Sequence, residues 1–191
     1  ILAVRIEAFS FQPGFAIGIA AASLTGQYLG AGSPRHAKKA ILVCTALSSL
    51  LMGAMGFAFV FGGSTIVGWF SSQKEHLDAA PQCLFITGLV QIPFAVSIVI
   101  RQAMRGAGDV KSVMWITWIT TYAFRLPLAY AFSGVEIPLG GGRVIHNPFA
   151  GMHGDHPTLA GLWVGLCVEL LFRAALFAAR FIHGGWTKAR V

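Results

Sequence analysis

Residues 23–40, SLTGQYLGAGSPRHAKKA, decide the fold of this chain because they join two long uncharged runs, residues 8–34 and 40–73. Gly30-Ala31-Gly32 suits the end of a helix, where a positive φ is often required. Ser33-Pro34 suits the start of the next helix, a hydroxyl N-cap before the residue whose missing N–H costs nothing at the first helical position. Three cations follow, at Arg35, Lys38 and Lys39. The stretch therefore predicts a helix, a tight basic turn and a second helix.

A second basic turn of the same kind, RGAGD at Arg105–Asp109, again follows a long apolar run. We expect the Asp109 side chain to cap the helix that comes after it. We interpret both turns as structural and expect them on the same side of a membrane. The expected turn residues are Gly30, Gly32, Gly106, Gly108 and Asp109.

The composition is that of a membrane protein. The 191 residues are 55% hydrophobic and only 11% charged, against roughly 25% charged residues in soluble domains. A domain of this size buries only about 70% of the surface that its unfolded chain exposes, so the lipid bilayer must serve as its solvent. A net charge of +7 would suggest nucleic acid in a soluble protein. Here the cations lie in short loops between apolar runs, which favours membrane orientation over nucleic-acid binding.

Neither cysteine nor histidine patterns indicate a metal or a disulfide. Cys44, Cys83 and Cys167 lie inside apolar runs and form no CxxC motif, so they are interpreted as small apolar fillers. The longest loop, residues 134–157, contains the potential metal ligands His146, His153, Asp155 and His156. They have no regular spacing, and an exposed polar loop explains them equally well. We expect no bound metal and no cofactor.

Five apolar segments are long enough to cross a hydrocarbon core of about 30 Å, which takes about 20 helical residues. They are residues 9–29, 40–66, 81–100, 112–133 and 159–181. The sequence therefore predicts an all-α integral membrane protein with a single bundle of about five transmembrane helices.

Two of these segments contain a proline beside a polar residue. Pro13, next to Gln12, predicts a kink in the first half of its helix. This kink either serves helix packing alone or lines a cavity. Gln91 and Pro93 predict a break near the middle of the third segment, of the kind that transporters place at a binding site. Ordinary proline kinks are also common in membrane helices.

Three charged residues lie within the last two segments. Arg125, in Arg125-Leu126-Pro127, either extends to the membrane surface or pairs inside the bundle. Glu169 and Arg173 are four residues apart and share one helical face, which predicts an ion pair. That pair is either structural or part of a substrate or ion path.

Charge counting predicts the orientation. Three loops on one side hold nine cations and one acid, whereas the two loops on the other side hold two cations and four acids. By the positive-inside rule the C-terminus is cytoplasmic and the N-terminus lies outside. We therefore expect a multi-pass protein of the cell inner (plasma) membrane. An odd number of spans, with neither a start methionine nor a signal peptide, suggests that residues 1–7 are a turn continued from something upstream.

Several segments together resemble the MATE family, the multidrug and toxic compound extrusion transporters. Arg5-Ile6-Glu7 through Pro13-Gly14 to Gly26-Gln27-Tyr28-Leu29-Gly30-Ala31-Gly32 carries the first part of the resemblance. The Arg105–Asp109 turn, Arg125-Leu126-Pro127 and the ending from Gly161-Leu162-Trp163-Val164-Gly165 to Trp186 carry the rest. Each motif alone is weak, but together they cover nearly the whole chain outside residues 134–157.

The resemblance implies twelve helices in two six-helix lobes that export cationic, amphipathic compounds in exchange for Na⁺ or H⁺. This chain would supply helices eight to twelve of the C-terminal lobe. Its partners would be the lipid bilayer, the small substrates and the N-terminal lobe of the same protein. Some sodium-coupled members carry an acidic residue in the helix that matches residues 81–100, where this chain has Gln91 and apolar side chains. A sodium site of that type is therefore not expected here.

An exporter needs a desolvated polar group in a cavity between its lobes. The expected path residues are the polar groups Gln12, Gln27, Gln91 and Glu169, with Phe11 and Tyr122 as apolar or cation–π walls. A lipid-linked oligosaccharide flippase stays open, although it would be expected to show more cavity cations than Arg125 and Arg173. A membrane scaffold also stays open, whereas the lack of HExxH or paired aspartates within the spans argues against an enzyme.

Overall fold

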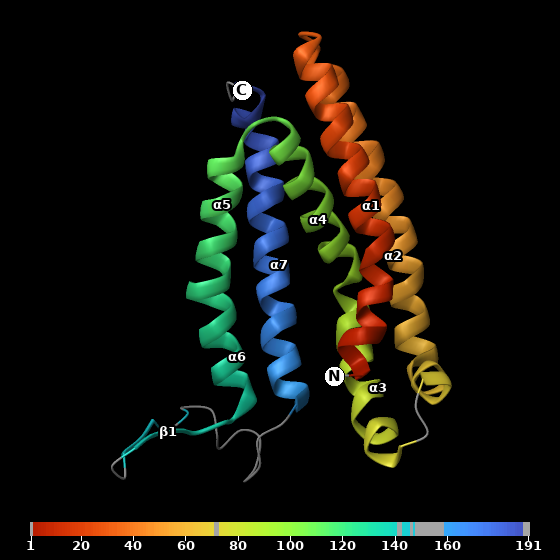
Figure 1. Cartoon of the computed structure of the whole chain (residues 1–191), viewed down its shortest axis with the longest axis vertical. Helices are drawn as coiled ribbons and strands as arrows, with labels where there is room; N and C mark the ends of the chain where they lie inside the picture. Colours follow the sequence, from red (N-terminus) through yellow and green to blue (C-terminus); the bar gives the residue numbers. More distant parts are fainter. Residues whose placement is uncertain (1, 71–72, 141–142, 146, 148–158, 189–191) are drawn as a thin grey trace.

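The computed structural model describes residues 2–70, 73–140, 143–145, 147 and 159–188, in which long helices form one bundle (Figure 1). In chain order the elements are α1 (Leu2–Gly30), α2 (Pro34–Phe70), α3 (Lys74–Leu89), α4 (Gln91–Gly106), α5 (Val110–Ile119), the π-helical turn η1 (Thr120–Arg125), α6 (Leu126–Ser133), β1 (Ile137–Gly140), β2 (Arg143–Ile145), α7 (Leu159–His183) and the 3-10 turn η3 (Gly185–Lys188). The predicted all-α membrane class is confirmed, with one small hairpin added.

The long helices have the length and composition of membrane spans. Among the described residues, α1, α2 and α7 each pass this test, whereas Ala80–Leu89 of α3 and Gln91–Gly106 of α4 pass it only together, as a pair that is bent by 60°. The elements α5, η1 and α6 follow one another without a gap, and the backbone is right-handed helical at both junctions. Residues 110–133 are therefore one helical rod with a π turn inside it. Five membrane crossings remain a prediction.

The first basic turn has the predicted order of helix, turn and helix, but the predicted hydroxyl cap of Ser33 is replaced by a contact with a histidine ring. α1 ends at Gly30, α2 begins at Pro34 and Gly32 takes φ +69°. The Ser33 carbonyl accepts the N–H groups of His36 and Ala37. Its hydroxyl lies 2.7 Å from His36 Nδ1.

The second basic turn differs from its prediction in one detail. Gly108 takes φ 83° as a turn glycine, but the Asp109 side chain makes no cap hydrogen bond. Its carboxylate instead accepts hydrogen bonds from Arg180, with an Nη2–Oδ2 distance of 2.8 Å. The predicted side-chain cap is wrong because a charged donor is a stronger partner for a carboxylate than a backbone N–H.

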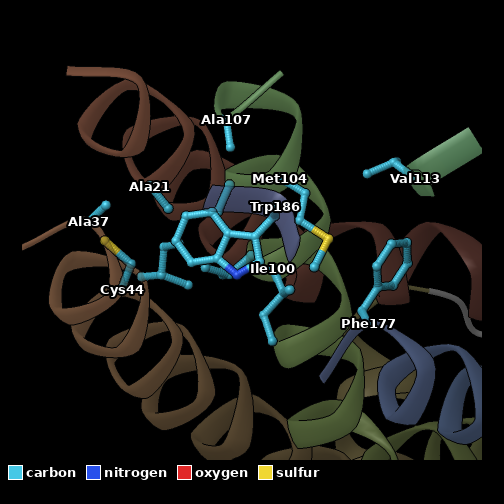
Figure 2. Packing of buried hydrophobic residues seen from close by; sticks show 12 residues of the cluster. Ala21, Ala37, Cys44, Ile100, Met104, Ala107, Val113, Phe177 and Trp186 are labelled. Carbon is cyan, nitrogen blue, oxygen red and sulfur yellow. The ribbon is translucent and has the colours of Figure 1, made fainter. Parts of the chain in front are cut away.

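Both basic turns and the C-terminal tail lie at one end of the bundle (Figure 1). There the indole of Trp186 in η3 is completely buried. Figure 2 shows it among buried side chains that come from different helices, including Ala21, Ala37, Cys44 and Met104. Its Nε1 donates to the Phe181 carbonyl at 3.0 Å. Through Trp186, the turn η3 packs against buried side chains of α1, α2, α4 and α7 and stabilises this end of the bundle.

The bundle packs α1 against α2 and α4, α2 against α3, and α7 against α4 and α6. Glycine allows close approach where α2 crosses α3: a Cβ on Gly56 would lie 2.7 Å from the Gly88 carbonyl oxygen. The outward face of α2 stays apolar, with Leu50 70%, Phe57 66% and Phe61 74% exposed. Apolar exposure on this scale is what lipid, rather than water, would cover.

Two predictions about local structure are wrong. Residues 2–7 are the first turns of α1 and not a turn before it, because their apolar positions continue the helix. Part of the predicted loop, residues 134–157, forms the antiparallel hairpin β1–β2, in which Ile137 pairs with Ile145. His146, His153, Asp155 and His156 lie outside the described residues. Within the described residues, no group of three or more His, Cys, Asp or Glu side chains could hold a metal.

Candidate functional site

A groove of about 430 Å³ opens between α1 and α7. Helix α4 packs against both of them and lies between them in Figure 1. The groove is lined by Val4, Glu7, Phe11, Phe15, Phe94, Ile98, Arg101, Arg125, Trp163, Leu166, Cys167, Leu170 and Arg173. Its lining therefore combines aromatic and aliphatic side chains with three cations and one carboxylate.

Helical spacing explains why these residues share one cavity. The lining residues of α1 follow each other at intervals of three and four, from Val4 through Glu7 and Phe11 to Phe15. The same intervals separate Phe94, Ile98 and Arg101 on α4. Residues at this spacing occupy one face of a helix. Each of the two helices therefore lines the groove with one face.

The predicted break between α3 and α4 is present at Val90, and it sets the direction of α4. The two helices meet there at 60°. Pro93 has no N–H to donate and sits in the first turn of α4, where such a donor has no partner within the helix. Phe94, the next residue, donates its N–H to the Val90 carbonyl at 2.9 Å and continues the helix.

Side chains on either side of this break connect to both walls of the groove. Gln91, which is fully buried, donates from Nε2 to Ser10 Oγ at 2.9 Å, and Ser10 donates in turn to the Glu7 carbonyl at 2.7 Å. On the other side, Trp163 of α7 donates from Nε1 to Thr87 Oγ1 at 2.6 Å. Residues on the two sides of the bend therefore hydrogen-bond to α1, which carries Glu7, and to α7, which carries Trp163.

The predicted pair of Glu169 and Arg173 is present and buried. Arg173 Nη2 lies 2.7 Å from Glu169 Oε1, and the side chains are 9% and 0% exposed. Arg173 also donates from Nε to Thr120 Oγ1 at 3.2 Å and from Nη2 to Thr121 Oγ1 at 3.0 Å. Arg173 is thereby held at the edge of the groove, while Glu169 lies behind it.

The π turn η1 allows two successive threonines to bind the same guanidinium. In an ordinary α-helix, neighbouring residues point about 100° apart. In η1 the Leu126 N–H donates to the Thr121 carbonyl, five residues back. Such turns inside α-helices are frequent at functional sites. The sequence signal for it is Pro127, which has no N–H to donate and whose ring disfavours the preceding turn.

The expected path residues fall into two groups. Phe11 lines the groove, Gln91 is buried and tied to Ser10 beside the Glu7 carbonyl, and Glu169 pairs with the groove residue Arg173. The other three, Gln12, Gln27 and Tyr122, are exposed on the surface of the chain and line no part of the groove. Arg125 is half-buried and lines the groove.

Sequence reasoning missed Glu7, Arg101 and Trp163 as site residues. The prediction of a turn over residues 1–7 leaves out Glu7, although its spacing of four from Phe11 places both on one helical face. Arg101 ends a long apolar run, a position that is typical of a cation at the membrane boundary. Its spacing of three from the apolar Ile98 was the available signal that it continues an inward stripe.

Comparisons with known proteins agree on one family. The sequence model of the MatE family matches residues 1–131. The "Probable multidrug resistance protein NorM" of Thermotoga maritima is 27% identical over 190 residues, which cover 100% of this chain and 37% of that protein. The protein of the same name from Mannheimia succiniciproducens is 26% identical, covering 94% of this chain and 35% of its own length. "Protein DETOXIFICATION 14" of Arabidopsis thaliana is 27% identical, with 90% and 32% covered. The chain thus spans about a third of the length of these relatives.

Proposed function

The chain belongs to the MatE family, and on this premise we propose that the protein carrying it is a secondary active transporter and not an enzyme. It would export cationic or amphipathic drugs and toxins by antiport with Na⁺ or H⁺. The observation that carries this proposal is the groove, in which four aromatic side chains and one carboxylate face a common cavity. Aromatic faces and a carboxylate both attract organic cations, whereas the three arginines of the same groove attract anionic groups.

Glu7 is the groove residue on which coupling would depend in this part of the protein. An organic cation and the coupling ion cannot both neutralise one carboxylate, so each would displace the other. With two lobes moving against each other, this competition converts an ion gradient into export. The second lobe is the expected partner of this chain, and nucleic acid is not.

We further propose that the end carrying the basic turns is cytoplasmic and that the protein lies in the cell inner (plasma) membrane. The support is the shared position of the two basic turns and the tail (Figure 1), together with the excess of cations in these segments. Cations accumulate in cytoplasmic loops of membrane proteins.

The flippase alternative finds no support in the relatives described above, which are named multidrug resistance or detoxification proteins. The groove does hold Arg101 in addition to Arg125 and Arg173.

Dye export from proteoliposomes tests the proposed function. The full-length natural protein would be reconstituted, a fluorescent organic cation loaded, and Na⁺ and H⁺ gradients imposed one at a time. We expect export under one gradient only. Export by Glu7→Gln should fall about tenfold, which corresponds to the loss of one charge-assisted interaction, and Glu7→Asp should keep part of it. Folded protein that exports nothing under either gradient would contradict the antiport proposal.

A further inference from the structure

Helix α2 carries positive charge and apolar surface on one face. Arg35 and Lys39 lie in its first two turns, four residues apart, and both are exposed. The same spacing leads to Val43, which is 58% exposed, and the next turns expose Leu47 and Leu50. Residues three or four apart share one face of a helix. These five residues therefore form one continuous exposed surface, which we call the α2 stripe.

The α2 stripe faces away from the core of the bundle. The opposite side of the same helix is buried and includes Ala37, Ile41, Cys44 and Ser48. Helix α2 begins at the basic end and lies at the outer edge of the bundle (Figure 1). Its outward face stays apolar as far as Phe61, which is the composition that lipid contact requires. The stripe is therefore placed to meet the surrounding membrane.

The two cations of the stripe lack an acidic partner within the described residues. The basic turns and the tail contain a single acidic residue, Asp109, and Arg180 binds its carboxylate with an Nη2–Oδ2 distance of 2.8 Å. Arg35 and Lys39 are thus free to bind an anion from outside the chain. A guanidinium holds a phosphate through two parallel hydrogen bonds, and an ammonium attracts it as a point charge.

The length of the α2 stripe indicates what kind of molecule carries the anion. Leu50 follows Lys39 by eleven residues, which is about 16 Å along a helix. Half of the hydrocarbon core is about 15 Å, the depth that the acyl chains of one leaflet fill. The long Lys39 side chain extends toward the headgroup region. A phospholipid whose phosphate meets the cations would lay an acyl chain along the apolar part of the stripe, whereas a soluble phosphate would leave that part unused.

We propose that the α2 stripe binds an anionic phospholipid, with the phosphate on Arg35 and Lys39 and one acyl chain along Val43, Leu47 and Leu50. Lys and Arg clusters beside a membrane span are typical of sites for anionic headgroups. The inference goes beyond the proposed function, because it gives the first basic turn a ligand in addition to its role in orientation. It does not depend on which compounds the groove takes.

Two lipids with the same acyl chains test the inference by binding alone. Native mass spectrometry of the purified full-length protein would give Kd for phosphatidylglycerol, which is anionic, and for phosphatidylcholine, which has no net charge. We expect the unaltered protein to bind phosphatidylglycerol about tenfold more tightly. The double variant Arg35→Gln with Lys39→Gln should lose this preference and bind both lipids alike. A phosphatidylglycerol with a photoreactive acyl chain should cross-link to residues 42–50, and cross-links confined to other segments would overturn the inference.

The double variant Arg105→Gln with Lys111→Gln is the matched control. Both residues are exposed, and they lie beside the second basic turn, at the same end of the bundle. The control removes the same charge from this end but leaves the α2 stripe intact, so Kd for both lipids should stay unchanged. An equal loss of phosphatidylglycerol binding in the two double variants would show that only the total charge matters. That result would overturn the site, and so would equal binding of the two lipids by the unaltered protein.

Glycerol phosphate distinguishes a lipid from a soluble anion. It has a phosphate but no acyl chain, so a large excess should leave phosphatidylglycerol bound to the unaltered protein. Displacement by glycerol phosphate would assign the two cations to a soluble anion and overturn the lipid assignment. None of these measurements needs an ion gradient. Failure of dye export and failure of this inference are therefore distinct results.

Discussion

Among single residues, Glu169 and Arg173 show how buried charges depend on each other. Removing one member of a buried pair leaves an uncompensated charge and costs about 3–5 kcal/mol, whereas replacing both with apolar residues is often neutral. We therefore expect Glu169→Leu to lower the free energy of unfolding by about 3 kcal/mol. The double variant Glu169→Leu with Arg173→Met should recover most of this loss. Thermal unfolding can be followed with a thiol-reactive dye, because all three cysteines are buried.

The matched control is Asp109→Asn, which weakens a pair whose arginine side chain is 28% exposed. Partly exposed pairs contribute only about 1 kcal/mol or less. If Glu169→Leu destabilised the protein no more than Asp109→Asn, the buried pair would have no special role in stability.

The sequence predicts a contact between residues of the same helix better than it predicts which residues face another helix. The Glu169–Arg173 pair was predictable, since a spacing of four within one helix places both side chains together. Gln12, Gln27 and Tyr122 are exposed on this chain, and their place in a path between two lobes stays a prediction. Periodicity shows which residues share a face, but which face meets another helix depends on packing that a single sequence does not specify.

At the scale of elements, proline marks both irregular helices, yet only one was predicted. Gln91 and Pro93 lie in a long apolar segment, so a break there was expected and is found at Val90. Pro127 was seen only as part of a family motif. A proline near the end of a span can be accommodated by a cap, a kink or a π turn, and the sequence does not choose among them. The choice here follows from Arg173, which binds both Thr120 and Thr121.

The crossing of α2 and α3 depends on glycine at position 56. A Cβ there would meet the Gly88 carbonyl oxygen at 2.7 Å and Gln91 Cβ at 3.0 Å. We expect Gly56→Ala to destabilise the protein by about 2 kcal/mol, as overpacking typically does. Gly68→Ala, on the same helix with nothing within 4 Å, should be neutral or slightly stabilising because alanine favours helices. Equal melting temperatures for the two variants would show that α2 and α3 can move apart without cost.

For the whole molecule, the turn η3 packs together helices that are distant in sequence. Trp186 is fully buried in the cluster at the basic end of the bundle (Figure 2). Replacing a buried tryptophan with alanine costs about 3–5 kcal/mol, so Trp186→Ala should lower the unfolding temperature clearly. Trp69→Ala is the control, since Trp69 is 79% exposed. A tail that contributes little would make the two variants equally stable.

The direction of the bundle in the membrane connects the basic turns to function. If the basic end is cytoplasmic, the opposite end, where α3 begins, faces outside. Two exposed positions report on this, Gln73 before α3 and Lys111 in the first turn of α5. In a cysteine-free background of the natural protein, a membrane-impermeant maleimide should label Gln73→Cys in intact cells. It should reach Lys111→Cys only after permeabilisation, because the positive-inside rule keeps the basic turns within the cytoplasm. The reverse labelling pattern would show the opposite orientation, with the basic turns and η3 outside the cell.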